Sequence, residues 1–283
     1  MRAVLLAALA LLAGGCAVAG RLGTMPHPAR VGAPPADLGA EAVTVPVPAR
    51  APLGGWYVDA PAGAPAVVLL HGHTDTRRQM LGRARFLVDA GYAVLLIDLP
   101  GHGESAAERV TFGLHERHAA SAAVDYVRRR RPQTDVGVLG VSLGAASAAM
   151  AGPFLEADAL VLDQSFATFE DAVRDRAQRF LGPLSGPAEA ALVGQIRVQL
   201  GVPPDSLRPV AALARSSQPT LVIGGTDDAY APPADTRALF EAAPEPKALW
   251  MVEGAQHEDL LEREPEAYPQ RVLGFFGRHL RAR

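Results

Sequence analysis

The chain of 283 residues has a single cysteine, Cys16, so it cannot form an intramolecular disulfide. It also lacks any long basic run: its arginines are interspersed with acidic residues, and its formal net charge is −3. The two basic clusters, Arg128 to Arg131 and Arg281 to Arg283, stand near the ends of predicted helices, where the helix dipole favours cations. We therefore expect no nucleic-acid partner. The oligomeric state is left open.

The apolar run from Ala3 to Ala13 is too short for a transmembrane helix, which needs roughly 20 residues. It follows Arg2 and leads into small residues, a pattern typical of a cleaved signal peptide, here over 1–19. The five residues that end at Cys16, Leu-Ala-Gly-Gly-Cys, resemble a bacterial lipobox. The resemblance implies cleavage before Cys16 and a lipid anchor on it, which would hold the protein on the bacterial cell envelope, facing outside the cytoplasm. The alternative is ordinary cleavage after Ala19, which would release a soluble secreted protein.

Residues 20–41 are rich in proline, glycine and alanine and lack helical or strand periodicity, which predicts a flexible tether. From residue 42 onwards, short apolar runs alternate with longer amphipathic segments. Apolar strands separated by helices are typical of a mostly parallel sheet with helices on both faces, so the fold class predicted for 42–283 is α/β. The eight predicted strands are Ala42 to Val47, Gly55 to Asp59, Val67 to His71, Ala93 to Asp98, Val136 to Val141, Ala159 to Asp163, Thr220 to Gly224 and Leu249 to Val252. The predicted crossover helices are Arg77 to Ala90, Leu114 to Arg131, Leu143 to Leu155, Ala234 to Ala243 and Glu266 to Leu280.

Between Phe166 and Ala214 this alternation fails. Amphipathic stretches around Arg174 to Phe180 and Ala188 to Leu200 are separated by glycine and proline. We predict that the insertion over 166–214 forms a short helical cap.

The strongest local signal is the pentapeptide Gly140-Val141-Ser142-Leu143-Gly144, which lies between a predicted strand and a predicted helix. In a G-x-S-x-G elbow a sharp turn exposes a nucleophilic serine, and glycines flank it because neighbouring backbones approach closely. The pattern predicts that Ser142 is a nucleophile.

Two further segments, His71-Gly72 and the run from Asp98 to Ser105, stand with this elbow in the order and spacing of the α/β-hydrolase superfamily. The chain resembles that superfamily from about Val43 to its C-terminus. The residues from Thr111 to Glu116 are similar to those of bacterial esterase-like and prolyl-oligopeptidase-like branches. The resemblance implies an α/β-hydrolase fold with an eight-stranded sheet and a serine hydrolase that needs no cofactor.

A serine hydroxyl is a weak nucleophile at neutral pH, so it needs a base that is itself oriented by a third group. His257 is the predicted base, because the loop that holds it leaves the last predicted strand at the edge of the sheet that carries the elbow. The family usually has glycine where this chain has Gln256, a difference that affects loop shape more than proton transfer.

The acid is expected after the strand that ends at Gly224. Asp228 and Asp227 are adjacent candidates there, and Asp228 with Pro232 fits the register of the family. Asp163, at the end of the preceding strand, is a third candidate.

The negative oxygen of a tetrahedral intermediate needs preorganised donors. The resemblance implies two backbone N–H groups, those of Leu143 and His73. The group His71, His73 and Asp75 fits this loop better than a metal site, so no metal is expected. The glycine-rich run 98–105 lacks the third glycine of a dinucleotide-binding loop, so no nucleotide cofactor is expected either.

The predicted reaction is cleavage of a carboxylic ester or related acyl bond through an acyl-enzyme. The modest cap favours a small or medium acyl substrate. A serine peptidase or an acyltransferase would use the same residues and stays an alternative, as does a surface binding protein without turnover.

Overall fold

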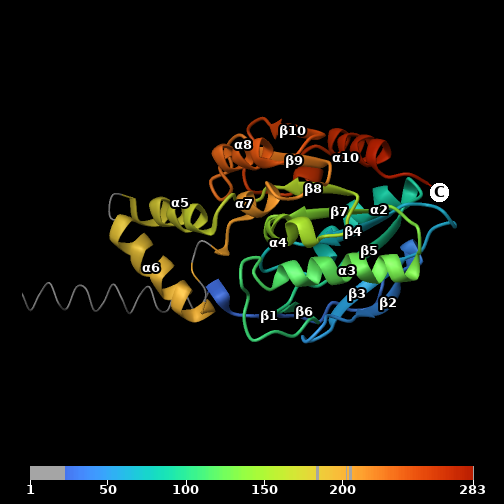
Figure 1. Cartoon of the computed structure of the whole chain (residues 1–283), viewed down its shortest axis with the longest axis horizontal. Helices are drawn as coiled ribbons and strands as arrows, with labels where there is room; N and C mark the ends of the chain where they lie inside the picture. Colours follow the sequence, from blue (N-terminus) through green and yellow to red (C-terminus); the bar gives the residue numbers. More distant parts are fainter. Residues whose placement is uncertain (1–22, 183–184, 202, 204–205, 283) are drawn as a thin grey trace, which may run out of the picture.

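The computed structural model describes residues 23–182, 185–201, 203 and 206–282. At its centre is an eight-stranded sheet with helices on both faces (Figure 1), so the predicted α/β fold is confirmed. The strand order is β10-β9-β8-β7-β4-β5-β3-β2. Strand β3 pairs antiparallel with β2 and β5, and the other described pairs in this sheet are parallel. The strands are β2 (Glu41–Val45), β3 (Leu53–Val58), β4 (Ala66–Leu70), β5 (Ala93–Ile97), β7 (Val136–Val141), β8 (Ala159–Asp163), β9 (Thr220–Gly225) and β10 (Lys247–Val252).

The eight strands correspond to the eight predicted ones, with small shifts at their ends. The first was predicted to reach Val47 but ends at Val45. Pro46 follows directly, and proline has no N–H to continue the ladder of hydrogen bonds.

Each face of the sheet is covered by its own set of helices. Val68 and Leu70 of β4 belong to the core under α3, α4 and α8, whereas Val67 and Leu69 belong to the core under α2 and α10. Side chains alternate in this way along a strand, and burying each one contributes about 1.5–3 kcal/mol. The helices that flank the sheet are η2 (Arg77–Met80), α2 (Leu81–Asp89), α3 (Glu116–Arg130), α4 (Leu143–Ala151), η3 (Gly152–Phe154), α7 (Pro209–Leu213), α8 (Pro233–Ala242), α9 (Leu260–Arg263) and α10 (Ala267–His279).

Two helices, α5 (Phe169–Leu181) and α6 (Ser185–Leu200), lie between β8 and β9 in the chain, in the region predicted to form a cap. They project from one side of the body (Figure 1). The Thr168 hydroxyl accepts a hydrogen bond from the N–H of Asp171 at 3.0 Å and so begins α5. Phe169 and Val173 of α5 pack in a separate apolar cluster with Phe166 and Leu114 of the body.

The segment before β2 differs from the flexible tether predicted over 20–41. His27–Pro28 forms strand β1, which pairs in parallel with β6 (His102–Gly103) (Figure 1). Val31 is 2% exposed in the core under α2 and α10, and η1 (Ala36–Leu38) precedes β2. These contacts are to residues far along the chain and leave no local periodicity, so composition alone does not indicate them.

Cys16 and the rest of the predicted signal peptide lie outside the described residues. Among the helices that the structure describes, none is long and apolar enough to cross a membrane.

Candidate active site

Ser142 stands in a sharp turn between β7 and α4. Its φ is 51° and its ψ is −110°, a backbone conformation that is strained for a residue with a side chain. The N–H of Ser142 donates to the Asp163 carbonyl of the neighbouring strand at 2.8 Å. A Cβ on Gly140 would lie 2.4 Å from the Gly144 carbonyl carbon, and one on Gly144 would lie 2.2 Å from the Leu70 oxygen. Only glycine fits at either position, as the elbow pattern predicts.

The structure brings Ser142, His257 and Asp228 together from three different loops. Nε2 of His257 lies 3.1 Å from the Ser142 Oγ, and Nδ1 lies 2.7 Å from Asp228 Oδ2. With Nδ1 protonated towards the carboxylate, Nε2 is left as the acceptor of the serine proton.

Asp228 is held in place by its own loop. Its Oδ1 accepts hydrogen bonds from the N–H groups of Tyr230 at 2.7 Å and Ala231 at 2.9 Å, and the residue is 2% exposed. The neighbouring Asp227 is exposed, and its side chain lies near the hydroxyl of Thr226 instead. Of the two adjacent aspartates, Asp228 alone contacts the imidazole of His257.

Asp163, the third candidate acid, serves a different group of residues. Its Oδ2 accepts from Arg83 Nη2 at 3.1 Å and from the Tyr268 hydroxyl at 2.7 Å. Burial raises the pKa of Asp163, and the Arg83 charge opposes that shift. Burial also acts to lower the pKa of Arg83, but Tyr268, Asp163 and Asp259 together raise it, so the guanidinium stays charged. Asp163 is part of a buried ion pair beneath the site.

Gln164 is a site residue that the sequence did not reveal. Its Nε2 donates to Asp228 Oδ2 at 3.2 Å and to the Gln256 carbonyl at 2.6 Å, so it joins the acid loop to the histidine loop. It directly follows β8 and has a φ of 53°. No motif contains it, because its partners are 64 and 92 positions away in the chain.

Two hollows with different linings meet at Ser142. One, of about 220 Å³, is apolar and is lined mainly by Phe112, Phe166, Phe169 and Leu192, with Leu143 beside the serine. The other, of about 460 Å³, is polar and includes Asp75, Arg83, Gln164, Tyr230 and Asp259 with His257. A bound molecule with one apolar end and one polar end would therefore have its junction at the Ser142 hydroxyl.

Both residues predicted to supply the oxyanion-stabilising N–H groups, Leu143 and His73, lie beside Ser142. Leu143 is the first residue of α4, where backbone N–H groups have no acceptor within the helix. His73 lies in the loop after β4 and lines both hollows with Ser142.

The side chain of His71, at the start of this loop, is hydrogen-bonded through both ring nitrogens. Its Nδ1 contacts the Gly72 carbonyl at 2.7 Å, and its Nε2 accepts from the Leu99 N–H at 2.9 Å. Complete burial lowers the pKa of His71 to about 3, with further lowering from the positive charges nearby, so this ring is neutral.

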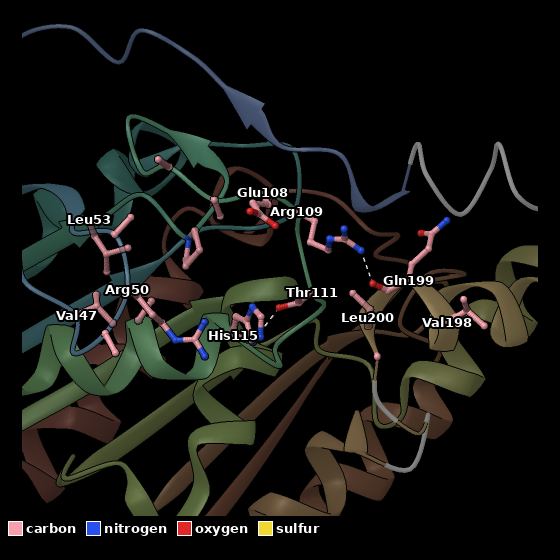
Figure 2. A pocket seen from close by; sticks show the side chains of 17 residues that line it. Val47, Arg50, Leu53, Glu108, Arg109, Thr111, His115, Val198, Gln199 and Leu200 are labelled. Atoms are coloured by element: carbon pink, nitrogen blue, oxygen red, sulfur yellow. Dashed lines mark hydrogen bonds between the residues drawn. The ribbon is translucent and has the colours of Figure 1, made fainter.

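A larger hollow of about 610 Å³ lies apart from these residues (Figure 2). It is lined by the β2–β3 turn, the loop before α3 and the end of α6, and it contains neither Ser142 nor His257. Arg109 crosses its rim and donates to the Gln199 carbonyl of α6, which ties the cap helix to the body (Figure 2).

Residues 67–271 match the sequence profile of the Alpha/beta hydrolase family. The chain belongs to this family. The matched range begins in β4, ends in α10 and includes Ser142, Asp228 and His257. Family membership supports hydrolytic activity in general and leaves the bond cleaved open.

Individual relatives of this α/β hydrolase are more distant. The uncharacterized protein YqkD of Bacillus subtilis (strain 168) is 26% identical over 226 residues, which are 78% of this chain and 74% of YqkD. The esterase Pf2001 of Pyrococcus furiosus has a TM-score of 0.74 at 24% identity, over 90% of this chain and 98% of that one. Est1E of Butyrivibrio proteoclasticus, solved with ferulic acid bound, has a TM-score of 0.65 at 20% identity, over 83% and 100%. These structural likenesses show the shared fold.

Proposed function

We propose that this α/β hydrolase is a serine esterase that cleaves carboxylic esters of small or medium acyl chains through an acyl-enzyme. The observation that carries the proposal is the hydrogen-bonded series from Ser142 Oγ through His257 to Asp228, at 3.1 and 2.7 Å, built on a strained elbow. A serine in this setting loses its proton to the imidazole as it attacks a carbonyl.

In the proposed reaction, Ser142 Oγ attacks the ester carbonyl while His257 Nε2 takes the serine proton. The N–H groups of Leu143 and His73 stabilise the negative oxygen of the tetrahedral intermediate. His257 then returns the proton to the leaving alcohol. Water, activated by the same imidazole, attacks the acyl-enzyme and releases the acid, and Asp228 keeps the ring oriented throughout.

In the proposed complex, each of the two hollows binds one half of the ester. The apolar hollow near Phe112 and Phe169 suits the acyl chain, and the polar hollow suits an alcohol that carries hydrogen-bonding groups. One solved structure of the same fold, Pf2001 of Pyrococcus furiosus, is an esterase, which supports ester chemistry.

The test is hydrolysis of p-nitrophenyl esters of graded acyl length by wild type and Ser142→Ala. We expect turnover that peaks at short or medium chains and falls at least about 10³-fold in the variant. Turnover of long peptides alone would favour a peptidase, transfer to an added alcohol without hydrolysis would favour an acyltransferase, and a folded protein inert to every ester would favour a binding protein. Each of these results would contradict the esterase.

We further propose that the protein is anchored in the bacterial envelope through a lipid on Cys16, outside the cytoplasm, with no nucleic acid as a partner. The support is the lipobox-like segment and the absence of any other cysteine from the chain. Cys16→Ser should move the protein from the membrane fraction to the soluble fraction. Firm membrane attachment of Cys16→Ser would contradict the anchor.

A further inference from the structure

Three histidines from distant parts of the chain converge beside the candidate active site. His27 comes from β1, His73 from the loop after β4, and His102 from β6. One ring nitrogen of each lies within 4.8 Å of those of the other two. The ring centres are 5.1 Å apart for His27 and His73, 5.5 Å for His27 and His102, and 5.8 Å for His73 and His102.

The ring nitrogens of His102 have separate roles. Nδ1 lies 3.1 Å from the Pro100 carbonyl, so it carries the proton and donates it to that oxygen. Nε2 is therefore unprotonated and keeps its lone pair. The backbone pairing of His27 with His102 holds these two rings on the same side of the short ladder.

Two of the buried nitrogens lack the contact that such atoms normally have. Nε2 of His102 and Nε2 of His27 are inaccessible to solvent and have no hydrogen-bond partner among the described residues. Buried polar atoms are usually hydrogen-bonded, and an unsatisfied one needs an explanation such as an ion. A metal ion would satisfy both atoms at once.

We propose that His27, His73 and His102 bind a divalent transition-metal ion, best fitted by Zn²⁺, which fastens the N-terminal segment to the loop beside Ser142. Neutral imidazoles are preferred ligands of Zn²⁺, and three of them leave a fourth position for water. The Nδ1 contact of His102 with a backbone carbonyl is the usual outer support of a metal-binding histidine.

The spacing of the rings matches tetrahedral coordination. Zn–N bonds of about 2.0–2.1 Å put the ligand nitrogens about 3.3 Å apart and the ring centres about 5 Å apart. The observed ring centres are within about 1 Å of this spacing, and the ring nitrogens, which lie within 4.8 Å of one another, would move together when the metal binds. His71 also packs on His102, but both its nitrogens are engaged with Gly72 and Leu99, so it is not a ligand.

This proposal departs from the expectation, drawn from the sequence, that the chain has no metal site. The sequence raised only His71, His73 and Asp75, which are close together in the chain. Two of the three ligands now proposed, His27 and His102, meet because β1 pairs with β6, in a segment predicted to be a tether.

The experiment is zinc binding by tag-free protein that has been stripped with a chelator, incubated with excess ZnCl₂ and desalted. We expect about one Zn²⁺ per chain by elemental analysis, and Co²⁺ in its place should give the intense visible absorption of a tetrahedral complex. His102→Ala and His27→Ala should each weaken Zn²⁺ binding at least about tenfold against a competing indicator. His118→Ala, an exposed histidine on α3, is the matched control and should bind as wild type does.

Circular dichroism of each variant separates loss of a ligand from loss of the fold. If His102→Ala does not fold, His27→Ala decides, because His27 is only half-buried on an edge segment. Wild type that retains no zinc, or a folded His27→Ala that binds zinc and cobalt as wild type does, would overturn the site. The measurement is independent of ester hydrolysis, so failure of the proposed esterase would leave it unaffected.

Discussion

At the scale of single residues, the candidate site depends on a few side chains whose positions are fixed by backbone contacts. Asp228 is the clearest case, because two N–H groups of its own loop bind one carboxylate oxygen, while Gln164 and His257 contact the other. A carboxylate that accepts from both sides keeps the imidazole in the tautomer that can accept a proton from Ser142.

Asp228→Asn should therefore lower kcat for ester hydrolysis by on the order of 10⁴-fold, because an amide can hold the ring in the wrong tautomer. Asp227→Asn is the matched control and should change kcat less than about threefold, since that exposed side chain does not touch the ring. Steady-state kinetics on one ester compares them. An equal loss in the two variants would contradict the assignment of the acid.

The sequence predicted that Ser142, His257 and Asp228 lie close together, and the structure places them within hydrogen-bond distance. Each stands in a short pattern at the end of a predicted strand, and the ends of parallel strands meet at one edge of the sheet. The sequence was insufficient for Gln164, which follows β8 without a motif. Nothing local to Gln164 indicates that its amide bridges Asp228 and the loop of His257.

At the scale of elements, the helix α2 is fastened to the sheet by a buried charge. Arg83 is 1% exposed, contacts Asp163 at the end of β8 and lies over the ring of Tyr268 from α10 at 4.9 Å. Two residues further along, Arg85 pairs with Asp37 on the surface, with both side chains about half exposed. The same helix thus offers a buried and an exposed ion pair.

Arg83→Met should lower the free energy of unfolding by about 3–5 kcal/mol, because it removes the positive charge that pairs with the buried Asp163. Arg85→Met should cost less than about 1 kcal/mol, since solvent screens the exposed pair. Urea denaturation of the two variants measures the difference. Equal costs would show that Arg83 contributes no more than a surface charge.

The turn between β7 and α4 gives a second prediction. Gly140→Ala should lower the free energy of unfolding by about 1–3 kcal/mol and reduce ester hydrolysis, because the new methyl would overlap the backbone of Gly144. Gly277→Ala, in α10 with no atom within 4 Å of the added carbon, should instead stabilise by about 0.5–1 kcal/mol. Thermal and urea unfolding give both values, and a neutral Gly140→Ala would contradict the tight elbow.

Among the elements, the eight strands and the helices α2, α3, α4, α8 and α10 followed from the pattern of apolar residues. The short helices α7 and α9 were not predicted. The two-residue strands β1 and β6 could not be predicted. Each is too short for a pattern, and they form only because the folded domain brings His27 next to His102.

At the scale of the whole molecule, the segment before β2 is part of the folded body. Val31 is buried in the core under α2, and its carbonyl accepts from Arg78 Nη1 at 3.1 Å. Burial of one valine side chain is worth about 1.5–3 kcal/mol, a sizeable fraction of the stability of a single domain.

A chain that begins at Ala42 should therefore melt about 4 °C or more below one that begins at Gly23, when both are measured in a chelator so that bound metal does not contribute. Differential scanning fluorimetry of the two purified chains is the measurement. Equal melting temperatures would restore the flexible tether that the composition predicted.

The most direct test of the serine hydrolase is covalent labelling with a fluorophosphonate, followed by intact mass and peptide mapping. The expected result is one adduct per chain on Ser142, absent from Ser142→Ala and strongly reduced in His257→Ala, because the imidazole activates the hydroxyl that it contacts. A folded wild type that takes up no label, or an adduct on another residue that persists in Ser142→Ala, would contradict the assignment of Ser142 as the nucleophile.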